Sequence, residues 1–238
     1  DIKIVRRNIQ INPVPYYGMV DDETGLIILK NFTRDCTQEV ENALKELKEE
    51  KGAEKVILDL RGNPGGLMEE AVKLANLFLP KGSEVVSTRG KIERWDKVYR
   101  APRAPVDTVI PLTVLIDRRS ASASEIVAGA IQDHDRGVIV GNRSFGKGLV
   151  QTTRNLPYNT KLKVTTAKYY IPSGRCIQAL DYSERNEDGS VGYVPDSLIS
   201  EYETANGRTV YDGGGISPDV IVDNDQYSNV IFALMSQQ

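Results

Sequence analysis

Residues 56–66 decide the fold and read Val-Ile-Leu-Asp-Leu-Arg-Gly-Asn-Pro-Gly-Gly. Residues 56–60 are a nearly continuous apolar run of strand length, which is typical of a strand covered on both faces in a parallel sheet. The glycines and the proline of residues 61–66 predict a loop, and residues 67–78, with apolar side chains at helical spacing, predict a helix. A strand, a loop and a helix in this order indicate an α/β fold built from crossover units.

The same order of elements recurs on both sides of this stretch. Upstream, residues 26–29 predict a strand and residues 33–50 an amphipathic helix. Downstream, the second crossover unit is a strand at 112–116, a helix of small residues at 121–132 and a strand at 138–141. The remaining expectations are additional β-structure at 84–88, 92–99 and 161–170, an extended start at 2–11, a polar, turn-rich segment at 181–215, and weak helical periodicity at 224–236.

Composition excludes several classes of protein. The 238 residues carry 30 Lys and Arg against 33 Asp and Glu, so no basic surplus favours a nucleic-acid partner. No apolar run approaches the roughly 20 residues that span a bilayer. Cys36 and Cys176 lie far apart and predict neither a disulfide framework nor a zinc site, and the single histidine, His134, excludes multi-histidine metal sites. Because the first residue is Asp1 rather than Met, we expect a piece of a longer protein.

Residues 120–125 read Ser-Ala-Ser-Ala-Ser-Glu and lie between a buried strand and a helix. In one interpretation, Ser122 and Glu125 form an S-x-x-E capping box and the other serines are merely small. In the other, Ser122 is a nucleophile at a strand-to-helix junction, where helix N–H groups stabilise a developing oxyanion. Taken alone, the sequence favours the capping box.

A serine nucleophile needs a base, and His134 fails on geometry. Twelve residues of helix place it roughly 18 Å along the axis from Ser122. We therefore expect His134 at the helix end, where the dipole favours it. The remaining candidate is a lysine that loses its proton in a desolvated pocket.

Residues 144–151 supply such a lysine, because Lys147 lies between two glycines and beside Phe145 and Leu149, and we expect it to be buried. The spacing does not fit a phosphate-binding loop. Gln151 either orients the lysine amine or is an ordinary polar strand residue, and its spacing favours neither interpretation.

The glycine-rich residues 61–66 make a turn by default. They also allow close approach of a substrate, so that the N–H of Gly65 or Gly66 joins that of Ala123 in an oxyanion hole. The G-x-G-x-x-G pattern of a dinucleotide site does not occur here.

Together these motifs resemble the catalytic core of the carboxyl-terminal processing (tail-specific) proteases, a family of serine peptidases. The resemblance spans nearly the whole chain and rests on residues 59–66, residues 120–126, residues 145–148 with Gln151, and residues 213–220. The family's nucleophile falls on Ser122. Lys147 follows it by 25 positions and Gln151 follows Lys147 by four, which is similar to the family's spacing.

The resemblance implies a Ser122–Lys147 dyad held by Gln151, hydrolysis through an acyl-enzyme without metal or organic cofactor, and an α/β crotonase and Clp-protease-like fold with added β-structure. Family members usually carry a PDZ domain, and nothing here resembles one. Arg119 stands where the family commonly has glycine, and we expect its side chain to narrow the cleft. The expected organisation is a peptidase core over residues 1–238, with a lead-in at 1–30, the catalytic core at 31–222 and a helical segment at 223–238.

The predicted function is a serine endopeptidase that cuts protein or peptide substrates near their C-termini. The resemblance also implies a cell-envelope location, periplasmic or exported. A homo-oligomer is possible, but the sequence does not determine the oligomeric state. The main alternative is a catalytically degenerate peptide-binding or scaffold module on the same fold. An acyl-CoA enzyme on the related crotonase fold would need a CoA pocket and acid-base carboxylates that the sequence does not identify.

Overall fold

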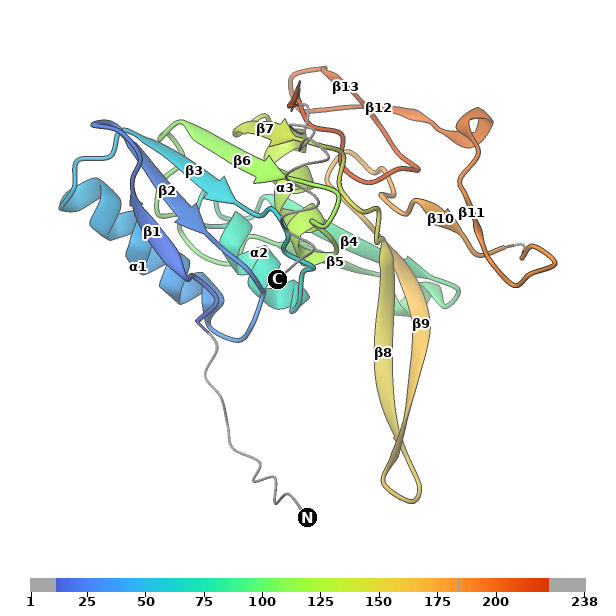
Figure 1. The fold of residues 1–238 in the computed structure, drawn as a ribbon. Coiled ribbons are helices and arrows are strands. Elements are labelled where there is room, and N and C mark those ends of the chain that lie inside the picture. The colour runs from blue at the N-terminus through green and yellow to red at the C-terminus, as the bar shows by residue number, and fades with distance from the viewer. Residues whose placement is uncertain (1–11, 184, 223–238) are drawn as a thin grey trace, which may run out of the picture.

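The structure, a computed structural model, describes residues 12–183 and 185–222 (Figure 1). Its main sheet has the strand order β1-β2-β3-β6-β7-β14. The strands are β1 (Tyr16–Met19), β2 (Thr24–Ile28), β3 (Lys55–Asp59), β6 (Leu112–Ile116), β7 (Val138–Gly141) and β14 (Val220–Ile221). Strands β1 and β2 pair antiparallel, and all other neighbours pair parallel. The predicted parallel sheet of crossover units is confirmed.

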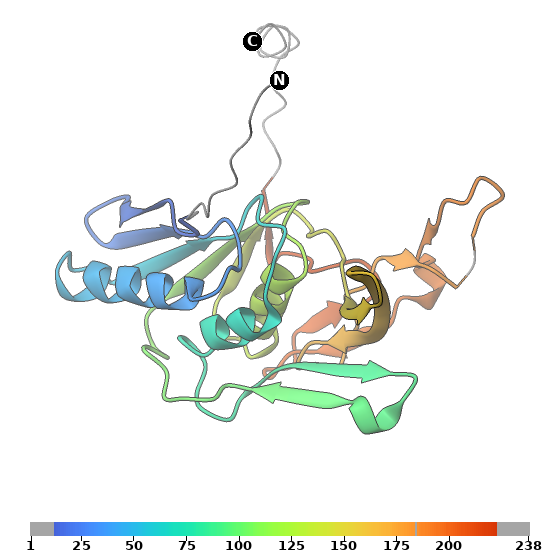
Figure 2. The ribbon, with the colours of Figure 1, turned by 90° about the horizontal axis from the view of Figure 1, so that it is seen from below.

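Three helices cover one face of this sheet (Figure 2). They are α1 (Cys36–Glu49), α2 (Met68–Ala75) and α3 (Ala123–Asp133). Because β2, β3, β6 and β7 are added in one direction and crossovers between parallel strands are right-handed, the helices fall on the same side. Helix α2 ends earlier than predicted, but Leu77 and Phe78 beyond it remain fully buried.

The strands alternate between a fully buried and a partly buried face. In β3, Val56 and Leu58 are buried, whereas Ile57 between them is half-buried. In β6, Val114 is buried and Leu115 half-buried. All three described helices pack on the same face of the sheet (Figure 2), so among the described residues no helix covers the other face of residues 56–60, contrary to the prediction.

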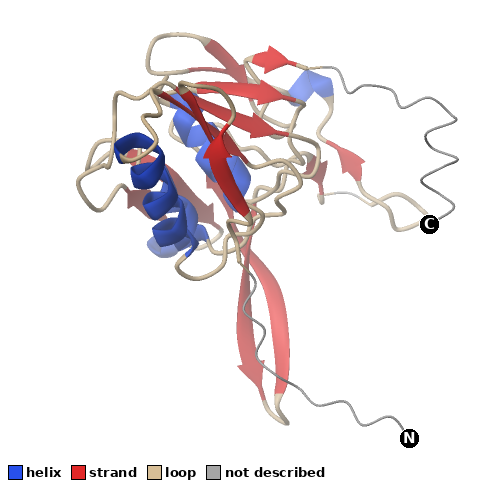
Figure 3. Ribbon diagram, turned by 60° about the vertical axis from the view of Figure 1, so that its left-hand side comes forward, coloured by secondary structure: helices blue, strands red, loops and turns tan. Residues whose placement is uncertain are grey.

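A second, antiparallel sheet has the order β5-β4-β9-β8. Its strands are β4 (Glu84–Gly90), β5 (Lys97–Arg100), β8 (Leu149–Leu156) and β9 (Thr160–Tyr170). Strand β4 packs against α2 and α3 on their side away from the main sheet (Figure 2). The β8–β9 hairpin projects from the body of the molecule (Figures 1 and 3), and Tyr158 at its turn is 97% exposed.

Smaller elements complete the described part of the chain. The expected strand at 92–99 begins instead with a 3₁₀ turn, η1 (Glu93–Trp95). The turn-rich residues 181–215 contain short antiparallel pairs and a second 3₁₀ turn: β10 (Leu180–Asp181) with β11 (Gly192–Tyr193), η2 (Asp196–Leu198), and β12 (Glu201–Glu203) with β13 (Thr209–Tyr211).

Two expected segments lie partly or wholly outside the described residues. Within the lead-in at 1–30, β1 and β2 are members of the main sheet, and the extended start at 2–11 is not described. The helical segment at 223–238 also lies outside the described residues. Of the helices described, none is long and apolar enough to cross a membrane.

Candidate active site

Three loops meet at one edge of the main sheet, because each follows the carboxyl end of one of three adjacent parallel strands. Residues 61–66 follow β3, residues 117–122 follow β6, and residues 142–148 follow β7. The main chain joins them: Ala121 N–H donates to the Asn63 carbonyl (3.0 Å) and Phe145 N–H to the Ser120 carbonyl (3.0 Å). All three predicted motifs therefore share one site.

The three serines of residues 120–124 have different surroundings. The Ser120 hydroxyl donates to the Leu60 carbonyl (2.8 Å) and the Ser124 hydroxyl to the Asn63 carbonyl (3.0 Å), and both side chains are fully buried. Ser122 is half-buried and makes neither kind of bond. Ser120 and Ser124 thus attach this turn to the glycine-rich loop, and Ser122 is the one of the three serines whose side chain is partly exposed.

The backbone of Ser122 is strained. Its φ is 56° and its ψ is −112°, although it is not glycine, and it is the N-cap of α3. Such a conformation costs free energy and is concentrated at functional sites, among them the turns that present nucleophiles. The helix N-terminus that follows adds positive electrostatic potential next to the hydroxyl. Arg119, three residues earlier, has an exposed side chain.

The glycine-rich loop packs directly against Ser122. A Cβ atom on Gly65 would lie 2.8 Å from the Ala123 nitrogen and 2.8 Å from the Ser122 Cβ, and Gly65 has a φ of 94°. The Gly65 N–H donates to Asn63 Oδ1 (2.9 Å), so it is occupied. The N–H groups of Gly66 and Ala123 make no hydrogen bond to any residue that the structure describes. Of the three predicted oxyanion donors, two are open in this arrangement.

Glu125 joins the serine turn (residues 120–124) to the lysine loop (residues 142–148), a role that the sequence interpretation missed. Its fully buried carboxylate accepts hydrogen bonds from the N–H groups of Ser122 (2.8 Å), Gly146 (2.6 Å) and Lys147 (2.9 Å) and from the Ser144 hydroxyl (2.5 Å). Burial raises the pKa of Glu125, and these four bonds oppose that shift. The S-x-x-E pattern was a visible signal, but it was interpreted as a helix cap alone.

Lys147 is held by its main chain and not by its side chain. Its N–H donates to Glu125, and its carbonyl accepts a hydrogen bond from the Tyr169 hydroxyl (2.5 Å). The side chain is exposed, and its amine makes no hydrogen bond or ion pair within the described part of the chain. The topology thus brings the Lys147 backbone beside the serine turn, while the amine lies in solvent.

The expected burial of Lys147 is wrong, and the flanking glycines supply the reason. Gly146 and Gly148 are buried and pack against residues 178–179, where a Cβ atom on either glycine would lie 2.8 Å or less from the nearest atom. Lys147, between these two packed glycines, is the residue that is left exposed. Phe145, which was expected to cover the lysine, is itself 53% exposed.

Gln151 lies on β8, just after a register shift between Val150 and Gln151 in the pairing with β9. Its side chain is exposed and lines a cavity of about 660 Å³, whose lining includes neither Ser122 nor Lys147. The structure therefore shows no contact between Gln151 and the lysine amine.

Tyr169 on β9 is a second residue that sequence reasoning missed. It is 3% exposed, and its hydroxyl lies 3.1 Å from Ser122 Oγ and 2.5 Å from the Lys147 carbonyl oxygen. Burial raises its pKa, so the phenol is neutral near pH 7. Alternation along residues 161–170 predicted the strand but not which tyrosine faces the serine.

The motif at residues 213–220 supports the lysine loop. Ile216 N–H donates to the Ser144 hydroxyl oxygen (2.7 Å), and Ser144 N–H donates to the Ile216 carbonyl (3.0 Å). A Cβ atom on Gly215, whose φ is 76°, would lie 2.7 Å from Ser144 Oγ. This motif therefore does more than make a turn before β14.

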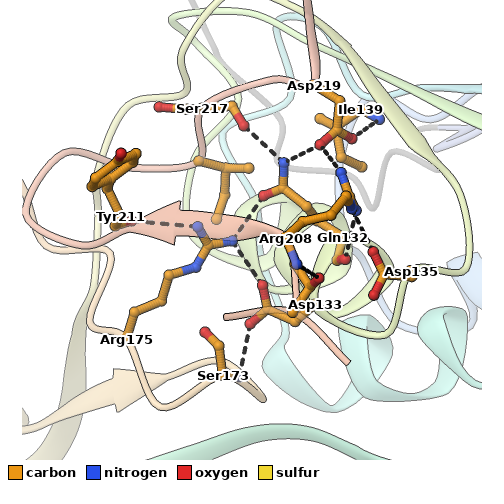
Figure 4. A network of polar contacts seen from close by, with 12 residues as sticks. Gln132, Asp133, Asp135, Ile139, Ser173, Arg175, Arg208, Tyr211, Ser217 and Asp219 are labelled. Atoms are coloured by element: carbon orange, nitrogen blue, oxygen red, sulfur yellow. Dashed lines mark hydrogen bonds and ion pairs between the residues drawn. The ribbon is translucent and has the colours of Figure 1, made fainter. Parts of the chain in front are cut away.

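The far end of α3 is fixed by a buried polar network (Figure 4). Arg175, 1% exposed, donates to Asp133 Oδ1 (2.8 Å) and Gln132 Oε1 (2.8 Å), and Ser173 N–H donates to the other Asp133 oxygen. His134 is the C-cap of α3 and lies with Nε2 2.7 Å from the Glu84 carbonyl oxygen. The prediction that His134 belongs to the helix end is confirmed.

Known proteins resemble the chain both in sequence and in structure. A family model described as Peptidase family S41 matches residues 23–184. A carboxy-terminal-processing protease of Bartonella bacilliformis is 41% identical over 84% of this chain and 44% of its own length. A probable CtpA-like serine protease of Staphylococcus aureus is 32% identical over 97% of this chain and 39% of its own length. The chain therefore spans less than half the length of these two relatives.

Solved structures agree with these matches. The photosystem II D1 C-terminal processing protease superposes with a TM-score of 0.67 at 29% identity, over 92% of this chain and 50% of that one. A putative S41 protease of Bacteroides fragilis has the same fold, with a TM-score of 0.66 at 14% identity, over 97% of this chain and 59% of that one.

Proposed function

Because this chain belongs to peptidase family S41, we propose that it is a serine endopeptidase in which Ser122 is the nucleophile and Lys147 the general base. The observation that carries the proposal is the contrast among the three serines. Ser122 alone of them is accessible, has a strained backbone and lies beside open N–H groups, whereas Ser120 and Ser124 are buried and bonded to carbonyls.

The proposed reaction is acyl transfer. The Ser122 oxygen attacks the carbonyl carbon of the peptide bond, its proton passes to the Lys147 amine, and the N–H groups of Gly66 and Ala123 stabilise the oxyanion. The resulting Lys147 ammonium then protonates the leaving amine, and water, giving a proton to the neutral lysine, attacks the acyl-enzyme and releases the carboxyl product as the Ser122 oxygen regains its proton. The exposed lysine side chain must turn toward Ser122 for this step, which its flexible four-carbon stem allows. Gln151 is proposed to orient the amine in that arrangement.

The proposal also covers the class of substrate and the cellular location of the protein. The relatives' names refer to carboxy-terminal processing, and we infer that this chain likewise cuts protein substrates near their C-termini, binding them through that region. A cell-envelope location belongs to the same proposal, supported by the family resemblance.

Labelling with a fluorophosphonate, which reacts with activated serines, tests the nucleophile. Ser122→Ala should abolish labelling. Ser124→Ala, a matched change two positions away, should keep it and lose only about 1 kcal/mol of unfolding free energy with its hydrogen bond. A labelled Ser122→Ala variant would remove the assignment, and an unlabelled wild-type chain would favour the degenerate peptide-binding module.

A further inference from the structure

The Tyr169 hydroxyl lies between the proposed nucleophile and the main chain of the proposed base. It approaches Ser122 Oγ (3.1 Å) and the Lys147 carbonyl oxygen (2.5 Å) from inside the molecule. The Tyr169 main chain is fixed to the same loop, since its N–H donates to the Gly148 carbonyl (3.0 Å). One rigid, buried side chain therefore touches both halves of the site.

The Tyr169 phenol has two oxygen neighbours but only one proton to donate. A phenol has one proton, a carbonyl oxygen can only accept, and a serine hydroxyl can do either. When Tyr169 donates to the Lys147 carbonyl, Ser122 must be the donor in the other contact. The Ser122 proton then points at the phenol oxygen and away from the lysine amine. When Tyr169 donates to Ser122 Oγ instead, the serine proton is free to face a base.

We propose that Tyr169 is a positioning residue that holds Ser122 Oγ in place while the serine turns its proton from the phenol to the Lys147 amine. The proposal rests on the nucleophile assignment made above. Rotation of the phenol proton from the Lys147 carbonyl to Ser122 Oγ makes the exchange possible without loss of a hydrogen bond to the serine. No covalent bond of Tyr169 breaks, because its buried phenol stays neutral.

The same donor acts again when negative charge develops. As Ser122 loses its proton during attack, and as its oxygen departs from the tetrahedral intermediate in deacylation, Oγ becomes a stronger acceptor. Hydrogen bonds to charged groups are stronger than those between neutral groups. Removal of the phenol hydroxyl should therefore slow turnover more than it weakens substrate binding.

The test compares Tyr169→Phe with Tyr170→Phe in the 238-residue chain. Tyr170 is the next residue on β9, and its ring lies against Arg89 (4.7 Å from guanidinium carbon to ring centroid). On a flexible peptide, Tyr169→Phe should lower kcat roughly ten- to hundredfold and leave KM within about threefold, whereas Tyr170→Phe should change neither. The wild-type pH profile of kcat should have an ascending limb in which the proposed base loses its proton. Tyr169→Phe should leave the midpoint of this limb unchanged, because Tyr169 is not the group that titrates there.

The outcomes separate this proposal from the proposed function. Normal kcat in a folded Tyr169→Phe variant, with wild-type labelling intact, would overturn the role of Tyr169 alone. A displaced midpoint of the ascending limb would also overturn it, because Tyr169 would then take part in the titration. A wild-type chain that neither labels nor cleaves would contradict the nucleophile assignment itself.

NMR tests the hydrogen bond between Tyr169 and Ser122 independently of enzymatic activity. With ¹³C at the ring carbon that bears the hydroxyl, the eleven tyrosines report their hydrogen bonding by NMR. Ser122→Ala should move one tyrosine signal that Ser124→Ala leaves in place, and this signal should be the one missing from Tyr169→Phe. If no signal moves in folded Ser122→Ala, the contact and the proposal are both wrong.

Discussion

At the scale of single residues, the carboxylate of Glu125 determines where the serine turn and the lysine loop meet. One oxygen accepts the N–H groups of Ser122 and Lys147, and the other accepts the Gly146 N–H and the Ser144 hydroxyl. All four partners donate, so the position requires two acceptor oxygens. A neutral isostere with one oxygen cannot supply them.

Glu125→Gln should therefore destabilise the fold despite its similar shape. Its amide NH₂ would face at least one pair of donors in a buried place, at a cost of about 2–4 kcal/mol. Urea denaturation measures this cost, with Glu39→Gln, an exposed position on α1, as the control. A Glu125→Gln variant as stable as the control would contradict the four-donor arrangement.

Lys147 permits a complementary test, because its side chain is exposed and carries no structural contact among the described residues. Lys147→Arg keeps the charge but replaces the proposed base by a group that stays protonated. Both Lys147→Arg and Lys147→Ala should lose at least about a hundredfold in turnover with little change in melting temperature. Near-normal peptide hydrolysis by Lys147→Arg would show that Lys147 is not the general base and acts only through its charge.

At the scale of elements, α3 is fixed at both ends. Its N-terminus carries Ser122, and its C-terminus is attached through the buried Asp133–Arg175 pair (Figure 4). A second arginine, Arg208, binds Asp135 and Asp219 nearby, but its side chain is 43% exposed. The two arginines thus make similar ion pairs in different surroundings.

Arg175→Met should cost about 3–5 kcal/mol of unfolding free energy, because Asp133 would remain buried without its partner. Arg208→Met should cost about 1 kcal/mol or less, since water screens an exposed pair. Chemical denaturation of the two variants compares them directly. Equal losses would show that burial does not determine the strength of this network.

At the scale of the whole molecule, the arrangement of the three loops was predictable. Short apolar runs ending in loops predict parallel strands, and parallel strands of crossover units bring their carboxyl ends to one edge. This brings together residues 61–66, the serine turn and the lysine loop, as observed. That the described helices cover only one face of residues 56–60 was not predictable, because apolar content does not reveal on which face the helices pack.

Details of the site depend on contacts between distant parts of the chain, which the sequence pattern does not contain. The outward direction of Lys147 follows from the packing of its glycine neighbours on residues 178–179. The contact of Tyr169 with Ser122 depends on the register of β9 against β4. Glu125 was visible as a cap, but its bonds to the lysine loop span about 20 residues.

The support of the lysine loop by residues 213–216 also determines when the site forms during synthesis. Ile216 follows Lys147 by 69 positions, which a ribosome translates in roughly 3–14 s at about 5–20 residues per second. Until that segment emerges, Ser144 lacks its hydrogen bonds with Ile216 and β7 lacks its neighbour β14. The nascent chain thus spends seconds without the contacts that support the loop of Lys147, so the proposed site is completed only after residues 215–216 are translated.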